Sequence, residues 1–112
     1  MTNIKDDVRI SIAQDYTITP SARYKKDGPF SGEDFRETCL EKHFENKEDN
    51  YRITIVLDGV EGFATSFLEE AFGGLARKFG KKRCLARLNF ISEEDRLLVD
   101  EIREYIEAST NE

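Results

Sequence analysis

The fold is indicated first by the run Ile53-Thr54-Ile55-Val56-Leu57, which the turn residues Asp58-Gly59 follow. Five mostly β-branched residues between polar segments predict a strand that is buried on both faces of a sheet. After a short loop, apolar residues recur at helical spacing, at Leu68, Ala71, Phe72, Leu75, Ala76 and Phe79. This pattern predicts an amphipathic helix over 66–79 that ends at Gly80.

The N-terminal part of the chain predicts two or three further elements. Alternation of apolar and polar residues over 8–12 predicts a half-buried strand, and the stretches 16–19 and 22–24 have weaker strand propensity. Ser31, followed by acidic residues, predicts the start of a helix. The apolar face of that helix carries Phe35, Cys39, Leu40 and Phe44.

The C-terminal part predicts one more strand and one more helix. Leu85-Ala86-Arg87-Leu88 is the strand candidate, and Ser92 has the position of a cap for a final helix, with Ile91 packing against its first turn. Strands that alternate with helices are typical of a sheet with parallel pairs and right-handed crossovers. We therefore predict a single α/β domain over 1–112, with flexible ends at 1–7 and 109–112.

Composition narrows the class of protein. The chain has 112 residues, 38% of them hydrophobic, which is enough for one core. It contains no run of roughly eighteen apolar residues, and its start lacks the basic and then apolar run of a signal peptide. Cys39 and Cys84 lie far apart without the C-x-x-C spacing of zinc sites. We therefore expect a cytoplasmic protein with no membrane contact and no metal ion.

The charge of the chain is unevenly distributed. The net charge is −6, and residues 93–112 account for it with eight acidic residues and two arginines. Residues 77–87 hold six basic residues and no acidic one. Basic residues are favourable at the C-terminal end of a helix because of its dipole. Since the chain is acidic and carries no nucleic-acid motif, we interpret 77–87 as a solvated helix end and expect no nucleic-acid partner.

Sequence motifs for catalysis are sparse. His43 lies one helical turn after Cys39, so the two side chains share a helix face. A nucleophile and its base usually come from separate elements, with a third group that orients the base. The chain also lacks the motifs of serine hydrolases, P-loop enzymes, dinucleotide-binding proteins and zinc peptidases. We therefore expect no catalytic residue and no cofactor.

Two features of the 66–79 helix call for an explanation. Gly73 and Gly74 inside the helix cost about 1 kcal/mol each relative to Ala, so we expect a close contact there with the sheet or with a partner protein. Ser66 and Glu69 have the S-x-x-E spacing of a capping box, which explains both residues without any function. The same position also suits a phosphoryl group, because free N–H groups and the helix dipole favour negative charge.

These residues resemble the STAS domain, the fold of anti-sigma-factor antagonists, and more closely the STAS-like family of unknown function. The matching residues are Asp58-Gly59-Val60, the stretch 66–75, Arg23-Tyr24 and the stretch 27–36. The resemblance implies a STAS-like α/β fold. In that fold a mixed sheet of about four strands has helices packed mainly on one face.

The resemblance also implies a function. In the antagonists, a serine at the position of Ser66 is phosphorylated by a histidine-kinase-type ATPase that is also the anti-sigma factor. This chain would then be a bacterial, non-catalytic regulatory module that docks on a protein partner, with Ser66 and Thr65 as phosphorylation sites. The implied docking surface comprises Gly62, Phe63, Ala64, Thr65, Ser66, Phe67 and Glu70. The alternative is an enzyme or small-ligand domain with its site at the same strand-to-helix turn.

Overall fold

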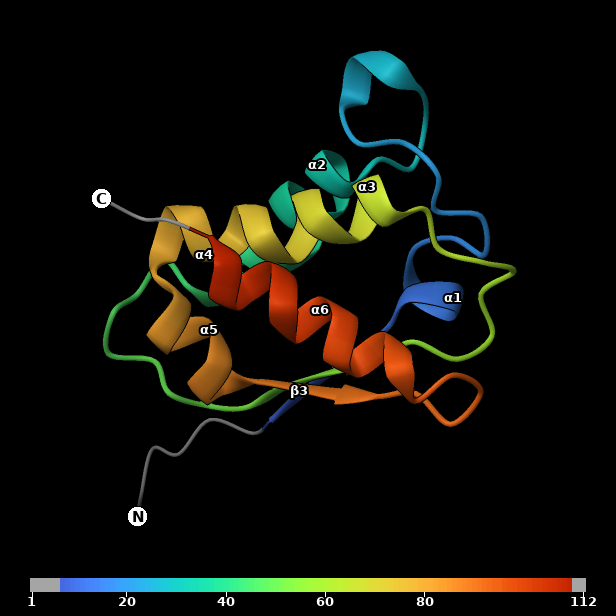
Figure 1. The fold of residues 1–112 in the computed structure, drawn as a ribbon. Helices are drawn as coiled ribbons and strands as arrows, with labels where there is room; N and C mark the ends of the chain where they lie inside the picture. Colours follow the sequence, from blue (N-terminus) through green and yellow to red (C-terminus); the bar gives the residue numbers. More distant parts are fainter. Residues whose placement is uncertain (1–6, 110–112) are drawn as a thin grey trace.

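A computed structural model describes residues 7–109 as one sheet with helices packed on one of its faces (Figure 1). The strands β1 (Val8–Ser11), β2 (Ile53–Val56) and β3 (Leu88–Ile91) form a parallel sheet in the order β1-β2-β3. Ile10 pairs with Ile55, and Ile55 pairs with Phe90. Right-handed crossovers between strands in sequential order place the connecting helices on one side of the sheet, as Figure 1 shows.

Helical segments fill both crossovers and the C-terminal part. Between β1 and β2 lie α1 (Ile12–Asp15), the 3-10 turn η1 (Lys25–Asp27), α2 (Gly32–Phe35), the π-helical η2 (Arg36–Leu40) and the 3-10 turn η3 (Glu41–His43). Between β2 and β3 lie α3 (Thr65–Leu68), the π-helical η4 (Glu69–Gly73), α4 (Gly74–Phe79) and α5 (Lys81–Arg87). The last helix is α6 (Leu97–Ala108). The segments α3, η4 and α4 follow one another without a break and form one helix over 65–79.

The sheet differs from the prediction in strand number and direction. Within residues 7–109 it has three strands, all parallel, rather than about four in a mixed sheet. The stretch 16–24 contributes only an isolated bridge between Ala22 and Ser31. Pro20 lies in this stretch and has no N–H group to donate to a ladder.

The strand β2 is buried on one face rather than on both. The side chains that face the helices are buried, whereas Thr54 and Val56 on the opposite face are half-buried. The buried side chains of this segment are Ile53, Ile55 and Leu57. The helices cover only the face to which these three residues belong, so an unbroken apolar run does not require a second covering layer.

Two C-terminal elements are present but begin further along the chain than predicted. Residues 85–87 belong to α5 and not to a strand, because Gly80, at φ 99°, lets the chain turn into a new helix before β3 begins. The last helix begins at Leu97 rather than directly after Ser92, and Ile91 belongs to β3. The Ser92 hydroxyl donates a hydrogen bond to the Asp95 carbonyl oxygen at 2.5 Å, which stabilises a turn instead of a helix start.

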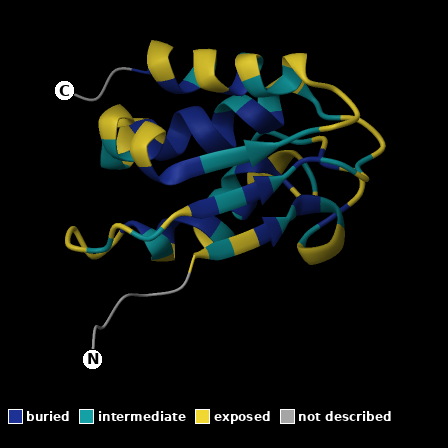
Figure 2. Ribbon diagram, turned by 90° about the horizontal axis from the view of Figure 1, so that it is seen from below, coloured by how far each residue is buried: buried dark blue, intermediate teal, exposed yellow. Residues whose placement is uncertain are grey.

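The core lies between the sheet and the helices. Phe35, Phe44, Phe67 and Phe72 are fully buried, and the rings of Phe35 and Phe67 lie 5.8 Å apart. Burial of a side chain of this size contributes about 1.5–3 kcal/mol. Figure 2 shows the buried residues concentrated in the interior helix and the strands, with exposed residues along the outer side of the last helix.

The expected flexible ends fall mostly outside the described residues, at 1–6 and 110–112. Of the two that the structure does describe, Asp7 accepts a hydrogen bond from the Arg52 N–H at 3.0 Å. Ser109 is buried and donates its hydroxyl to the Ile106 carbonyl oxygen at 2.7 Å. Both residues are therefore hydrogen-bonded to the folded domain.

Candidate functional site

The loops that follow β2 and β3 are bonded to each other at the carboxyl edge of the sheet. The Asp58 carboxylate accepts hydrogen bonds from the backbone N–H groups of Glu93 and Glu94, both at 2.9 Å. In return, the Glu94 carboxylate accepts a hydrogen bond from the Gly59 N–H at 3.0 Å. These bonds satisfy loop donors that would otherwise need water. They hold the loop after β2 against the approach to α6.

A second set of contacts holds the same loop from the other side. The Glu61 N–H donates to the Ile18 carbonyl oxygen at 2.9 Å, and the Ala64 N–H donates to that of Pro20 at 3.4 Å. The Phe63 ring lies 6.2 Å from the buried Phe67 ring. The Ile18 side chain beside the loop remains 46% exposed. The loop over 60–64 is therefore fixed in place while its outer side stays accessible.

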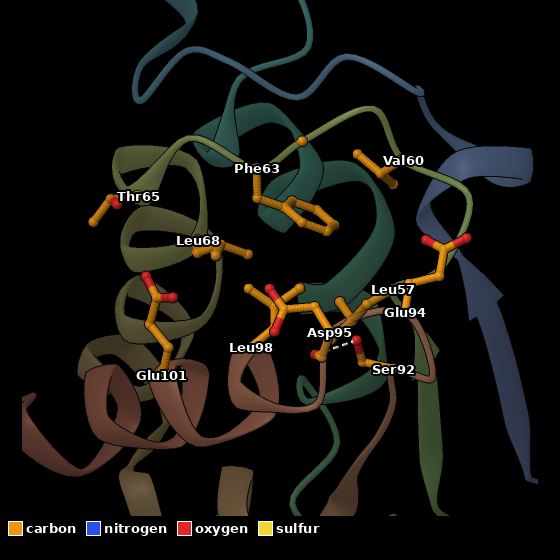
Figure 3. Close-up of a pocket in the computed structure, with 11 residues that line it drawn as sticks. Leu57, Val60, Phe63, Thr65, Leu68, Ser92, Glu94, Asp95, Leu98 and Glu101 are labelled. Atoms are coloured by element: carbon orange, nitrogen blue, oxygen red, sulfur yellow. Dashed lines mark hydrogen bonds between the residues drawn. The ribbon is translucent and has the colours of Figure 1, made fainter.

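A pocket of about 230 Å³ lies between this loop, α3 and α6 (Figure 3). Its walls are apolar at Phe63, Leu68 and Leu98, and carboxylates of Asp95 and Glu101 stand at its edge. It lies beyond the carboxyl ends of β2 and β3, where open α/β sheets usually bind their ligands.

The helix of the expected docking surface begins one residue earlier than predicted. Ala64 is the N-cap, at φ −73° and ψ 136°, and no side chain caps this end of the helix. Ser66 is therefore the second helical residue. The predicted capping box of Ser66 and Glu69 is wrong, because Glu69 binds Arg23 and Arg77 instead.

The expected surface residues fall into two groups. Gly62 and Thr65 are exposed, and Phe63, Ala64 and Ser66 are half-buried. Phe67 is fully buried in the core, and Glu70 is 8% exposed. The structure thus brings residues 62–66 to the surface together and leaves Phe67 and Glu70 beneath it.

Thr65 faces α6 at the edge of the pocket. The Tyr105 hydroxyl donates a hydrogen bond to Glu101 Oε2 at 2.5 Å. Burial and this bond raise the pKa of Tyr105, and the Thr65 hydroxyl acts in the opposite direction. A polar cluster therefore lies between the helix start and α6, formed by the hydroxyls of Thr65 and Tyr105 and the carboxylate of Glu101.

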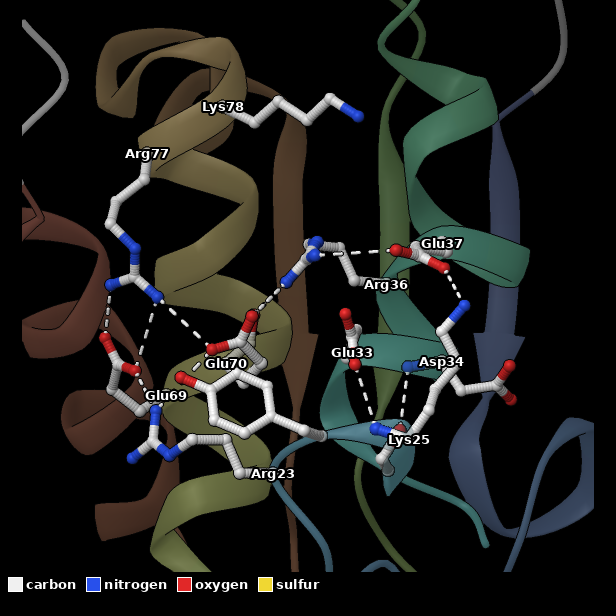
Figure 4. Close-up of polar contacts among 12 residues, drawn as sticks. Arg23, Lys25, Glu33, Asp34, Arg36, Glu37, Glu69, Glu70, Arg77 and Lys78 are labelled. Carbon is white, nitrogen blue, oxygen red and sulfur yellow. Dashed lines mark hydrogen bonds and ion pairs between the residues drawn. The ribbon is translucent and has the colours of Figure 1, made fainter. Parts of the chain in front are cut away.

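A network of ion pairs lies on the other side of the 65–79 helix, where it joins that helix to η2 and η3 (Figure 4). Arg36 is its centre: Nη1 binds Glu70 Oε2 at 2.5 Å and Nε binds Glu41 Oε2 at 2.9 Å. The Arg36 side chain is only 13% exposed. Lys78 also binds Glu41, at 2.8 Å. A charged group this deeply placed requires such partners, because an unpaired one is costly.

Glu69 extends the network toward the helix start. Its carboxylate binds Arg77 at 2.5 Å and Arg23 at 2.6 Å. The hydrogen bond from Arg77 lowers the pKa of Glu69, and that from Arg23 adds to the effect against the opposing influence of burial. Burial alone would raise the pKa of Glu41, but hydrogen bonds from Lys78 and Arg36 lower it.

The two glycines inside the helix make room for this network. A Cβ atom at Gly74 would lie 2.6 Å from Arg36 Nη1, and one at Gly73 would lie 2.8 Å from Glu69 Oε2. The close contact that the glycines predict therefore exists, but it is made with charged side chains and not with the sheet. Gly32 similarly lies against the Phe67 carbonyl oxygen, where a Cβ would clash.

The cysteines and the histidine are placed apart from the pocket. His43 Nδ1 lies 2.8 Å from the Tyr51 hydroxyl, and burial lowers the pKa of His43, with Lys42 and Arg87 adding to the effect. No hydrogen bond joins it to Cys39 within the described chain, where Cys39 Sγ lies 3.5 Å from Thr38 Oγ1. Burial raises the pKa of Cys84 to about 12.

Within residues 7–109, no group of three or more His, Cys, Asp or Glu side chains is arranged to hold a metal ion. No helix within the same range is long and apolar enough to cross a membrane.

The family to which the chain belongs is shown by a match over more than half of its length. The family described as STAS-like domain of unknown function (DUF4325) matches residues 31–97. The chain belongs to this family. The matched part of this STAS-like domain runs from the start of α2 to the start of α6 and includes the loop 60–64 and the whole 65–79 helix. No curated protein and no solved structure matches the chain.

Proposed function

We propose that this STAS-like domain is a non-catalytic regulatory module that docks on a protein partner through residues 62–66. The resemblance to anti-sigma-factor antagonists implies as partner a histidine-kinase-type ATPase that phosphorylates Ser66 or Thr65. The observation that carries the proposal is the accessible helix start, which has no capping side chain. Ala64 occupies the N-cap position without a side-chain hydrogen bond, so the first N–H groups of the helix are left to water or to an incoming acceptor.

The fixed position of the loop supports docking. Bonds from Asp58, Glu94 and the 17–20 segment hold the loop before any partner arrives. A surface that is ordered in advance loses less conformational entropy on binding. The exposed Ile18 and the half-buried Phe63 add apolar area beside the helix start.

The ion-pair network removes an obstacle to phosphorylation. A phosphate on Ser66 would be repelled by the neighbouring carboxylates of Glu69 and Glu70 if these were unpaired. Arg23 and Arg77 bind Glu69, and Arg36 binds Glu70, so this negative charge is largely compensated. The helix dipole and free N–H groups then favour the added phosphate.

Site-specific cross-linking tests this proposal. A photoreactive p-benzoylphenylalanine is placed at Thr65 in cells of the source organism, with the same residue at the exposed Lys82 of α5 as the matched control. We expect a discrete protein adduct from position 65 that is absent from position 82, and an ATPase-type kinase as its other component. No protein adduct at position 65, or the same adducts from both positions, would overturn the docking surface.

The pocket favours a second candidate, a small-ligand or enzyme site at the same turn. It lies at the carboxyl edge of a parallel sheet, as such sites do. Its volume of about 230 Å³ is, however, below the roughly 300–1,000 Å³ typical of ligand pockets. A metabolite that raises the melting temperature of the wild type, but not that of a Leu98→Arg variant with a filled pocket, would favour this candidate.

A further inference from the structure

The pocket beside the docking loop combines apolar walls with a negatively charged edge. Figure 3 shows Phe63 and Leu68 pointing into the space between α3 and α6, with the carboxylates of Asp95 and Glu101 beside it. Such a pocket suits a ligand with an apolar stem and a cationic end, because each part meets its complement.

The charge around the pocket is of one sign. No Lys, Arg or His is among the described residues that line it, whereas Glu94, Asp95 and Glu101 are. The surrounding segment 93–109 carries seven acidic residues and two arginines, a balance of −5. This edge of the molecule therefore attracts positively charged partners.

The carboxylates at the edge have capacity to accept donors. The Asp95 side chain forms no hydrogen bond or ion pair with any residue in the described range 7–109. Glu101 receives one hydrogen bond, from Tyr105, and a carboxylate has about four acceptor positions. Glu94, in contrast, is engaged with the Gly59 N–H and holds the loop.

Size and shape favour a single side chain with a planar cationic end. A pocket of about 230 Å³ is small for a cofactor but large enough for one long side chain. A guanidinium group is less strongly hydrated than an ammonium group, presents several donors to carboxylates and stacks on aromatic rings. Phe63 supplies such a ring, and Leu68 and Leu98 supply the walls for the methylene stem.

We propose that this pocket receives an arginine side chain of the docking partner, held between Phe63, Asp95 and Glu101. The inference rests on the proposed function and adds the chemistry of the partner: a segment that presents an arginine to the loop 62–66. The carboxylates make this contact selective for a basic segment, and the fixed loop supplies its shape.

Titration with two small probes followed by amide NMR tests the inference. The probes are N-acetyl-arginine amide and the uncharged, nearly isosteric N-acetyl-citrulline amide. We expect saturable shifts at Phe63, Thr65 and Leu98 with the arginine probe, and binding of citrulline weaker by at least about fivefold. Equal shifts with both probes, or no saturation with arginine, would overturn the inference.

Matched variants separate a specific contact from general attraction to an acidic surface. Asp95→Asn with Glu101→Gln removes two charges at the pocket, and Glu104→Gln with Glu107→Gln removes two on the exposed side of α6. We expect the first pair to weaken arginine binding by at least about fivefold and the second to leave it nearly unchanged. Equal losses would contradict the pocket.

The two proposals fail separately. Cross-linking at position 65 without arginine binding would leave the docking surface standing and remove the arginine contact. Arginine binding without any cross-linked protein would show that the pocket is selective for a guanidinium group, but it would remove the docking partner and with it the proposed function.

Discussion

Gly74 leaves the space that the Arg36 guanidinium occupies, since a Cβ atom at position 74 would lie 2.6 Å from Arg36 Nη1. Arg36 in turn binds Glu70 and Glu41, so the absence of one side chain permits the charge network that joins η2 to the 65–79 helix. The same network neutralises the carboxylates behind Ser66. A packing requirement in the middle of the helix is thus connected to the electrostatics of its first turn.

Gly74→Ala tests this relationship through stability. Alanine gains about 1 kcal/mol of helix propensity, but displacing Arg36 from its ion pairs with Glu70 and Glu41 costs more, so we expect a net loss of about 1–2 kcal/mol. Gly73→Ala is the control, because its Cβ would meet the end of the more exposed Glu69 side chain. Urea denaturation should rank Gly74→Ala below Gly73→Ala. Equal stabilisation by both would show that Arg36 does not occupy this space.

Ile55→Asp tests the placement of the central strand. Ile55 is fully buried against the helices, and an unpaired buried charge costs several kcal/mol, so this variant should not fold. Val56→Asp lies on the uncovered face and should remain folded. Circular dichroism melting distinguishes the two variants. A cooperative, wild-type-like melting curve for Ile55→Asp would mean that the strand faces the other way.

Ala64→Ser tests the position of the helix cap. Ala64 has the backbone conformation of an N-cap without a capping side chain, so a serine there should add about 1 kcal/mol of stability. Ser66→Ala should change stability by less than about 0.5 kcal/mol, because position 66 lies inside the helix. Chemical denaturation measures both. The opposite ranking would restore Ser66 as the cap.

Acid titration of stability tests the ion pairs of Glu69. Its folded pKa lies below the ordinary value of 4.5, so the unfolded state binds more protons in this range and stability falls as the pH drops below 4.5. Glu69→Gln should flatten this loss, and Glu104→Gln, on the exposed side of α6, should not. Burial lowers the pKa of the half-buried His43 from 6.5, so His43 adds a loss of stability as the pH falls below 6.5, and this loss should persist in both variants. Identical acid profiles for wild type and Glu69→Gln would argue against the pairing.

Local patterns predict the elements that are defined by their own apolar spacing. The strands near 8–11 and 53–56 and the helix that ends at Gly80 were all evident, because burial on one face imposes a period on neighbouring residues. The strand prediction at Leu85-Ala86-Arg87 was wrong because three residues are too few to distinguish the period of a strand from that of a helix. All three residues have high helix propensity, and they form the end of α5. The prediction that Ser92 caps the last helix was wrong because a serine hydroxyl can stabilise a turn as well as cap a helix.

The contacts that organise the site join residues far apart in the sequence, so no local sequence pattern predicts them. Asp58 binds N–H groups 35 and 36 residues away, and Arg23 binds Glu69 across 46 residues. Charged residues are common on helix surfaces, so their pairing cannot be predicted from spacing. The single signal was Gly73-Gly74, whose cost in a helix indicated a close neighbour without naming it.

The most direct test of the central proposal compares Ser66→Asp with Ser66→Asn. The two side chains are nearly isosteric and both tolerate the first turn of a helix, so they differ mainly in charge. The measurement is the yield of the protein adduct from p-benzoylphenylalanine at position 65, in variants shown to be folded at the assay temperature. A phosphate or an Asp side chain at position 66 places negative charge inside the docking surface, so we expect it to release the partner. If the module docks through residues 62–66, Ser66→Asp therefore loses the adduct and Ser66→Asn keeps it. Equal yields from Ser66→Asp, Ser66→Asn and wild type would contradict the proposal.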